Sequence, residues 1–219
     1  MIYRVYLDIF LVVLPVILSV YLIIWHRRND SQILEESQDP EKGRKAVRRS
    51  RVGDVLLTIL VVAMVAGGLL SCITKVQGSS MDDTLYDGQK LYGLRTDYNP
   101  LLKPQRGDIV VADSTVIGKL IVKRVIGVPG DEIRIENNRV YVNGILLEED
   151  YLPEPMKTKD GLWVLEDGMY FLLGDNRNVS DDSRRIGPVS EREMYAIVIF
   201  DLSGFQSYQQ PAGFAVLEP

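Results

Sequence analysis

The sequence predicts two membrane-spanning helices followed by a mainly β domain. Residues Ile9 to Trp25 form a run of 17 residues without a charge, and Val55 to Thr74 form a run of 20. A helix needs about 20 apolar residues to cross a hydrocarbon core, so the second run is long enough and the first is at the short limit. After Lys75 the apolar runs become short, rich in Val and Ile, and separated by turn residues, which is the pattern of β structure.

The distribution of basic residues predicts the orientation in the membrane. Residues 26–54 carry eight Lys and Arg, whereas only Arg4 precedes the first apolar run. An excess of Lys and Arg marks the cytoplasmic side. We therefore expect transmembrane helix 1 in residues 1–25, a basic cytoplasmic loop in 26–54, transmembrane helix 2 in 55–74 and an extracytoplasmic β-rich domain in 75–219.

Each of these segments has an alternative interpretation. The first apolar run resembles an export signal, but the residues before it are nearly uncharged and no small-x-small cleavage site follows it. The basic run could be a solvated patch that only touches anionic lipid, which fits the same topology. Within it, Ser37 to Arg51 has few apolar residues and is expected to be a mobile loop or a surface helix. Arg4 and Asp8, four residues apart, are positioned to pair near an interface.

The composition excludes several classes of protein. From Lys75 onward the chain carries 16 Lys and Arg against 23 Asp and Glu, a net charge of −7, which argues against nucleic acid as a partner. Cys72 is the only cysteine, so no intrachain disulfide forms, and its position in the second apolar run predicts burial in the membrane. The residues indicate no oligomeric state.

Turn chemistry places the strands of the outer domain. Ile109 to Ala112 and Leu120 to Val128 are predicted as buried strands, and Met169 to Leu173 and Ala196 to Phe200 as further strands. The pairs Asn137-Asn138 and Asn143-Gly144 predict two successive tight hairpins. Ser190 with Glu193 predicts a short capped helical turn. In the C-terminal segment the aromatic side chains are expected either to touch the membrane surface or to pack on the domain: Phe205, Tyr208 and Phe214.

The side chains available for catalysis are limited by the single histidine. His26 lies next to the first apolar run, so a Ser-His-Asp triad and a histidine-ligated metal are both excluded from the outer domain. A serine and a neutral lysine can perform acyl transfer without histidine. Ser80 follows the second apolar run directly, although a serine in a Gly-Ser-rich junction is more often a turn residue.

Lys123 is the best candidate for the base. Side chains two apart on a strand share a face, so Lys123 points with Ile121 and Val125, and burial among them would lower its pKa by roughly 3 to 5 units. The common fate of a strand lysine is to reach solvent or to pair with a carboxylate. Lys119 is the rival on the same face, but it follows Gly118 at the expected start of the strand, where solvent reaches it.

Four segments, in order, resemble the conserved boxes of bacterial type I signal peptidases. They are VQGSSMDDTL (76–85), RGDIVV (106–111), VKRVIGVPGD (122–131) and GDNRNVSDDSR (174–184), and the likeness extends to about Phe200. The resemblance implies a signal-peptidase-like β fold and a membrane-bound serine endopeptidase that cuts signal peptides from exported preproteins. It implies Ser80 as nucleophile and source of one backbone oxyanion donor, Lys123 as base, and Ser180 as the residue that orients the lysine amine. No cofactor or metal is expected.

The remaining residues of the third and fourth boxes are expected to support the site. Gly174 would allow close approach to the lysine, and Asp175 is interpreted as structural. Asp182 is expected to pair with Arg184 or Arg124 and so to hold its loop against the lysine strand.

Two positions depart from the family pattern. Asp83 stands where the family usually has proline, and Gly78, where some members have a serine hydroxyl, leaves the second oxyanion donor unassigned. These departures favour one alternative function, a catalytically inactive membrane-tethered β domain that binds peptides. A self-cleaving Ser/Lys repressor is the other, but it would need a DNA-binding domain in place of the first 75 residues.

Overall fold

The computed structural model describes residues 15, 17–30, 39–97, 101–204, 206–208 and 211–217. The chain forms two compact units, Met1–Leu69 and Leu70–Pro219, and each is considered by itself.

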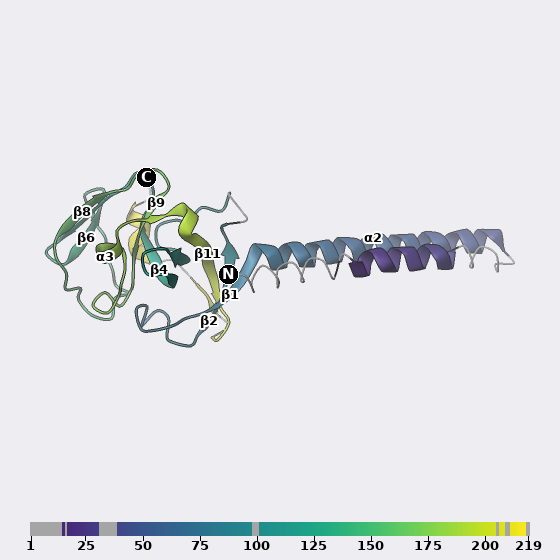
Figure 1. Ribbon diagram of the computed structural model, residues 1–219, viewed down its shortest axis with the longest axis horizontal. Coiled ribbons are helices and arrows are strands. Elements are labelled where there is room, and N and C mark those ends of the chain that lie inside the picture. Colours follow the sequence, from purple (N-terminus) through teal and green to yellow (C-terminus); the bar gives the residue numbers. More distant parts are fainter. Residues whose placement is uncertain are drawn as a thin grey trace. The chain divides into compact units, whose positions relative to one another are not determined.

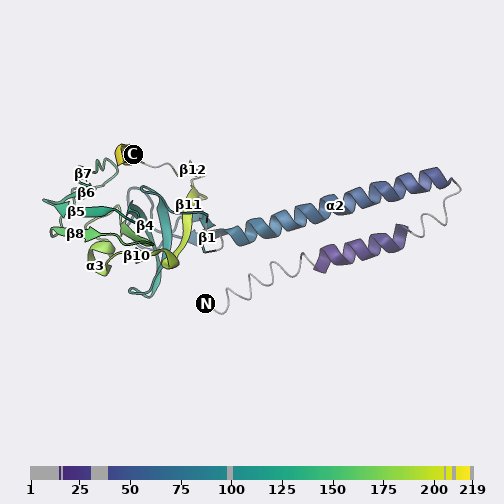
Figure 2. The same ribbon diagram turned by 90° about the horizontal axis from the view of Figure 1, so that it is seen from above.

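The first unit is helical (Figures 1 and 2). Residues 17–30 form one helix, and α2 spans Pro40–Leu70. Asp39 caps α2, since its Oδ1 accepts hydrogen bonds from the backbone N–H groups of Glu41 at 2.9 Å and Lys42 at 3.3 Å. The predicted basic segment is therefore helical from Pro40 onward and continuous with the apolar run.

One helix of the described residues, Glu41–Gly68, is long and apolar enough to cross a membrane by length and composition. Most of the first predicted span, and the Arg4 and Asp8 pair, lie outside the described residues. The prediction of a second span there stays a prediction.

The apolar run after Val55 does not remain helical to its end. The helix stops at Leu70, and Ser71–Lys75 form strand β1, which pairs antiparallel with β2 (Lys90–Arg95). The helix predicted over 55–74 was thus four residues too long, because pairing with β2 decides the backbone conformation of Ser71 to Thr74. Cys72 consequently packs against a protein core cluster and not within a membrane helix.

The second unit is mainly β and contains two sheets. The larger has the order β1-β2-β11-β3-β4-β9-β10, with β12 on β11, and its neighbouring strands are antiparallel. Its other strands are β3 (Ile109–Ser114), β4 (Lys119–Gly127), β9 (Met169–Leu173), β10 (Val189–Ser190), β11 (Met194–Asp201) and β12 (Gln206–Ser207). All four strands predicted for this sheet are confirmed.

The smaller sheet has the order β7-β6-β5-β8. Its strands are β5 (Glu132–Glu136), β6 (Arg139–Val142), β7 (Ile145–Leu146) and β8 (Gly161–Val164). The two predicted hairpins are confirmed: φ is +51° and +61° at Asn137 and Asn138, and +52° and +81° at Asn143 and Gly144. Positive φ at both central residues is the condition for the type I′ turn that joins twisted strands.

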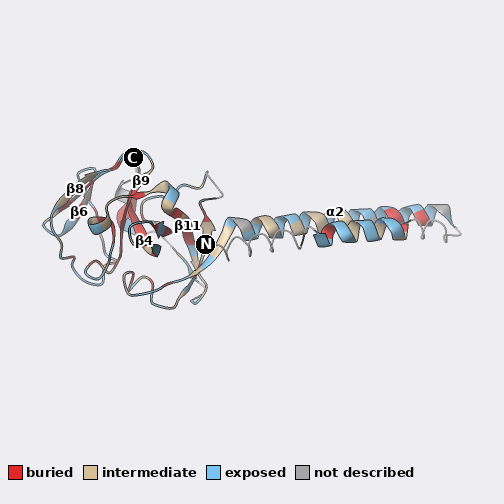
Figure 3. Ribbon diagram, in the orientation of Figure 1, coloured by how far each residue is buried: buried red, intermediate tan, exposed pale blue. Residues whose placement is uncertain are grey.

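Strand β3 lies at the centre of the core (Figure 3). Val110 and Ala112 point into one buried cluster, and Ile109 and Val111 into another on the opposite face. Both faces are covered, which explains the unbroken apolar run in the sequence. Three short helices complete the unit: α3 (Ser183–Ile186), η1 (Glu191–Glu193) and η2 (Ala212–Leu217). The predicted capping box of Ser190 and Glu193 is confirmed in η1.

Candidate active site

Ser80 lies in a tight turn that follows β1. The backbone N–H of Asp82 donates to the Ser79 carbonyl at 3.2 Å, and that of Leu85 donates to the Met81 carbonyl at 2.7 Å. Met81 and Leu85 are both buried in the core cluster below the turn. Two apolar anchors thus hold the turn down while Ser80 remains half-buried at the surface of the unit.

Two positions of this turn have left-handed backbone. Gly78 has φ +87°, and its N–H donates to Asp87 Oδ1 at 2.8 Å, so this backbone donor is already engaged. Asp83 has φ +74°. Proline fixes φ near −65° and cannot adopt that conformation, whereas aspartate is among the residues that tolerate it best. The departure at Asp83 therefore accompanies a different backbone at this point of the turn.

Lys123 projects from β4 on the face that was predicted. Ile121 and Val125 belong to one buried cluster, which also holds Val110, the residue paired with Lys123 across the sheet. The Lys123 side chain is itself buried, and its Nζ donates to Ser80 Oγ at 2.6 Å and to the Val122 carbonyl at 3.0 Å. The fold thus brings together the two groups that the sequence singled out 43 residues apart.

Burial lowers the pKa of Lys123 from 10.5 to about 8. Loss of hydration is the largest cause, and the positive charge of Lys119 acts in the same direction. The carboxylates of Asp182, Asp181 and Asp175 act against it. An amine with this pKa is uncharged in about one molecule in ten at pH 7. Lys119, the rival base, is exposed at the start of β4.

Arg124, the next residue on β4, is completely buried and points to the other side of the strand. Its Nε and Nη2 donate to the two carboxylate oxygens of Asp175, at 2.8 Å and 2.5 Å. Asp175 Oδ2 also accepts from Thr84 Oγ1 at 2.6 Å. The lysine strand, the loop after β9 and the serine turn therefore share one buried carboxylate.

The loop after β9 packs directly behind the serine. The Asn176 N–H donates to the Ser80 carbonyl at 3.1 Å. A Cβ added at Gly174 would lie 2.5 Å from that carbonyl oxygen and closer still to Ser180 Oγ. The close approach for which glycine was predicted is thus to the serine turn and Ser180.

Ser180 does not bond to the lysine amine in this structure. Its Oγ is buried and has no hydrogen-bond partner among the described residues, and the two acceptors of Lys123 Nζ are Ser80 and Val122. Its role in orienting the amine stays a prediction.

Asp182 pairs with Arg184, the first of its two predicted partners, at 2.7 Å. It also accepts from the Gly174 N–H at 3.1 Å and caps α3.

Sequence reasoning missed several residues that support the site. Arg177 is buried, donates to the Gly174 carbonyl at 3.0 Å and pairs with Glu149. Tyr151 stacks on the Arg124 guanidinium at 4.3 Å. A signal existed for Arg177, because it falls in the same box as Gly174, but the proline-bearing segment that holds Glu149 and Tyr151 was interpreted only as an exposed loop.

A cleft of about 610 Å³ opens over Ser80 and Lys123. One wall is the segment Ile73 to Met81, and the other is Lys119 to Lys123 with Ile117, Val179 and Asp181. Both walls have a free backbone edge: β1 pairs only with β2, and β4 pairs with β9 only from Arg124 onward. Because both backbone groups of Val125 bond toward β3, those of Leu120 and Val122 point away from β3, into the cleft.

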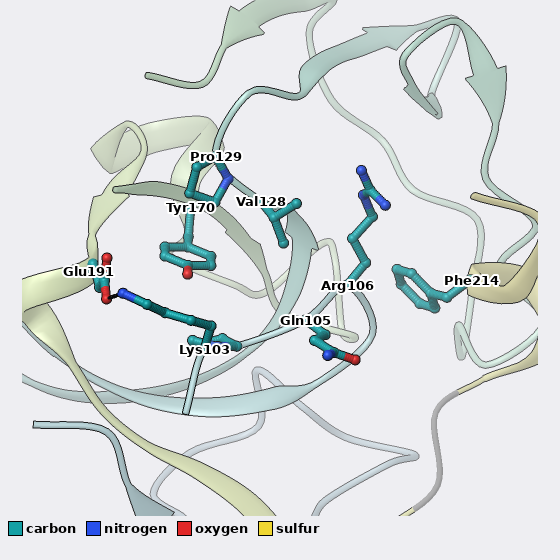
Figure 4. Close-up of a pocket in the computed structure, with 9 residues that line it drawn as sticks. Lys103, Gln105, Arg106, Val128, Pro129, Tyr170, Glu191 and Phe214 are labelled. Carbon is teal, nitrogen blue, oxygen red and sulfur yellow. Dashed lines mark hydrogen bonds and ion pairs between the residues drawn. The ribbon is translucent and has the colours of Figure 1, made fainter. Parts of the chain in front are cut away.

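A second cavity, of about 660 Å³, shares no lining residue with this cleft (Figure 4). Tyr170 and Glu191 lie on one side of it and Phe214 on the other. Its two cationic side chains are both paired, Lys103 with Glu191 and Arg106 with Asp131. We find no nucleophile and base together there, so the cleft over Ser80 is the candidate active site.

Comparison with known proteins agrees with the chemistry of this cleft. The profile of a family described as "Signal peptidase, peptidase S26" matches residues 49–202. The chain is 34% identical over 149 residues to a probable signal peptidase I-2 of Synechocystis sp., covering 65% of this chain and 68% of the relative. It is 30% identical over 192 residues to signal peptidase I of Bacillus amyloliquefaciens, covering 81% and 99%. A solved structure, signal peptidase I of Enterococcus faecalis, is 36% identical, covering 44% of this chain and 97% of that chain, with a TM-score of 0.40.

These matches define the class of protein as a serine peptidase with a mainly β, signal-peptidase-like fold. The chain belongs to the signal peptidase family S26, and its substrates are the signal peptides of preproteins.

Proposed function

We propose that this chain is a membrane-bound endopeptidase in which Ser80 and Lys123 cut signal peptides from exported preproteins on the extracytoplasmic side. The observation that carries the proposal is the 2.6 Å separation of Ser80 Oγ and Lys123 Nζ at the floor of a cleft. Burial of the amine supports it, since only an uncharged lysine accepts a proton.

The reaction follows in two steps. Lys123 Nζ takes the Ser80 hydroxyl proton as Oγ bonds to the scissile carbonyl carbon. When the C–N bond breaks, the Lys123 ammonium gives that proton to the leaving amine, and the signal peptide remains esterified to Ser80. Water then attacks the ester carbon, Lys123 takes a proton from it, and Ser80 recovers its proton as the C–O bond breaks. The Ser80 N–H is our proposed donor to the oxyanion.

The cleft suggests how the substrate is held. An extended peptide between β1 and β4 can bond to the free edges on both walls, which is recognition by strand addition. The Val122 carbonyl lies next to the reacting lysine, so a strand paired there would bring its scissile bond to Ser80.

The helical unit supports the membrane part of the proposal. Helix α2 begins with a basic segment and continues into an uncharged one, and β1 starts one residue after its end. With the basic segment inside, the catalytic unit lies outside. A substrate whose apolar segment is in the same bilayer is then concentrated in the plane of the enzyme. The first span and the assignment of residues 26–54 to the cytoplasm are parts of this proposal.

Processing of a purified preprotein by the full chain in lipid vesicles tests the chemistry. Ser80→Ala and Lys123→Ala are expected to abolish cleavage. Ser79→Ala and Lys119→Ala are the matched controls, because each removes the same side chain from a neighbouring position, and both are expected to retain most activity. Processing by Ser80→Ala or Lys123→Ala at the wild-type rate would refute the proposal and favour a domain that only binds peptides.

Two further experiments test the other parts. Ser180→Ala is expected to lower processing if the hydroxyl orients the amine, and an unchanged rate assigns Ser180 to the loop alone. External protease added to sealed vesicles should reach residues 174–184 when the catalytic unit faces outward. Protection of that loop in right-side-out vesicles contradicts the topology.

A further inference from the structure

The guanidinium of Arg124 is bonded on three sides. Asp175 accepts from its Nε and Nη2, and the Gly107 carbonyl accepts from its Nη1 at 3.0 Å. The remaining partner is the hydroxyl of Tyr208, which also accepts from Nη1. The Tyr208 ring centre lies 5.3 Å from the guanidinium carbon, so hydroxyl and ring both contact the cation.

Tyr208 belongs to the C-terminal segment, which is fastened to the domain at both ends. Strand β12 pairs with β11, and the Tyr208 N–H donates to the Ile199 carbonyl at 3.2 Å. Further on, Phe214 is buried and stacks on Tyr151 with 6.2 Å between ring centres. The two tyrosines that contact the Arg124 guanidinium are therefore each attached to this segment, one directly and one through Phe214.

Arg124 connects this segment to both reacting groups. It is the residue after Lys123 on β4, and the Asp175 carboxylate that it binds also accepts from Thr84, four residues beyond Ser80. The residue after Asp175 donates its N–H to the Ser80 carbonyl. A displacement of the guanidinium would therefore alter the distance between the lysine strand and the serine turn.

We propose that Tyr208 is a positioning residue for the Ser80 and Lys123 reaction, acting through the Arg124 guanidinium. The family match ends at residue 202, so this partner of Arg124 lies outside the matched region. The inference rests on the proposed function, because it assigns Tyr208 an effect on that reaction. Tyr208 does not line the cleft, so its effect should fall on the rate of reaction and not on substrate binding.

The test is steady-state processing of a preprotein by the full-length chain in vesicles, from pH 6 to pH 9.5. Tyr208→Phe leaves one Arg124 N–H without an acceptor and keeps the ring. We expect kcat to fall by about 10-fold, KM to stay within about twofold, and the acid limb of kcat/KM to move to higher pH as water reaches the lysine. Tyr208→His restores an acceptor nitrogen and is expected to retain a higher kcat than Tyr208→Phe.

Tyr141→Phe is the matched control, because Tyr141 also lies under an arginine, Arg134, at 4.5 Å, but on the smaller sheet. It is expected to keep the wild-type kcat and pH profile. Trp163 fluorescence confirms folding of each variant at the assay temperature, since Trp163 packs on Phe171 in the core.

Two outcomes overturn the inference. In the first, Tyr208→Phe is folded and keeps the wild-type kcat and acid limb, even if it melts at a lower temperature. In the second, Tyr208→His is no more active than Tyr208→Phe. Failure of the proposed function is recognised separately, because it requires that Ser80→Ala, with Tyr208 intact, still processes the preprotein.

Discussion

Replacement of Lys123 by methionine should make the protein inactive and, at neutral pH, more stable. The lysine amine is held among aliphatic side chains in the folded state, and the unfolded chain returns it to water. Methionine has similar length and no charge, so Lys123→Met removes the cost of burying the amine while filling the same space.

The size of the effect follows from the pKa of Lys123. A fall from 10.5 in the unfolded chain to about 8 in the folded one corresponds to about 3 kcal/mol, at about 1.4 kcal/mol for each pH unit. The lost hydrogen bond to Ser80 reduces the gain by about 1 kcal/mol, so Lys123→Met should be about 2 kcal/mol more stable at pH 7.

The sign of the pH dependence is fixed by proton binding. Between pH 8 and pH 10.5 the unfolded lysine holds a proton that the folded one has released, so the wild-type free energy of unfolding rises with pH across this window. The cost of the buried lysine is fully present below pH 8. The advantage of Lys123→Met should therefore shrink as pH rises from 8, and above pH 10.5 the variant should be about 1 kcal/mol less stable than wild type.

The assay is urea unfolding of the full chain in detergent micelles at several pH values, followed by Trp163 fluorescence. The sequence has two tryptophans, and a Trp25→Phe background leaves only the one in the catalytic unit. Lys119→Met, at an exposed position of the same strand, is the control and should change stability little at any pH. Equal stability of wild type and Lys123→Met from pH 6 to 10 would show that the amine is not buried at a cost, and the argument for a neutral base would fail.

Three other predictions concern the surroundings of the two reacting groups. Gly174→Ala should lower kcat/KM for preprotein processing by at least about 100-fold, since its Cβ would lie 2.5 Å from the Ser80 carbonyl oxygen. Asp175→Asn leaves the buried Arg124 charge uncompensated and should lower the free energy of unfolding in urea by about 3 kcal/mol or more, whereas Arg124→Met combined with Asp175→Leu should cost less. Asp83→Gly should raise the melting temperature through about 0.5 to 1 kcal/mol, and Asp83→Pro should lower it, because φ is +74° there.

Each of these has its own control and contrary result. Gly53→Ala adds a Cβ with no atom within 4 Å and should leave processing unchanged, and wild-type processing by Gly174→Ala would contradict the close approach. Glu136→Gln breaks an exposed ion pair with Arg134 and should change stability little, so an equally small effect of Asp175→Asn would argue against burial of that pair. A stabilising Asp83→Pro would mean that the turn does not have left-handed backbone at this position.

Local rules were sufficient wherever neighbouring residues decide the conformation. Asn137-Asn138 and Asn143-Gly144 predicted their turns because asparagine and glycine tolerate the positive φ that a tight hairpin needs. The alternation around Lys123 predicted its face for the same reason, since side-chain direction on a strand has a period of two. The helix end at Leu70 was missed because Ser71 to Thr74 are apolar enough for either structure, and pairing with β2 decides between them.

The sequence alone determined the mainly β domain, the face of Lys123, the exclusion of histidine from the reaction in that domain and, by resemblance, the family. Those properties depend on side-chain type and on spacing along the chain. Only the tertiary structure decided that Asp175, and not Asp182, neutralises Arg124, and that a tyrosine 84 residues further on also binds it. Which buried charges meet depends on how the sheet brings distant strands together, and a short-range pattern carries no record of that.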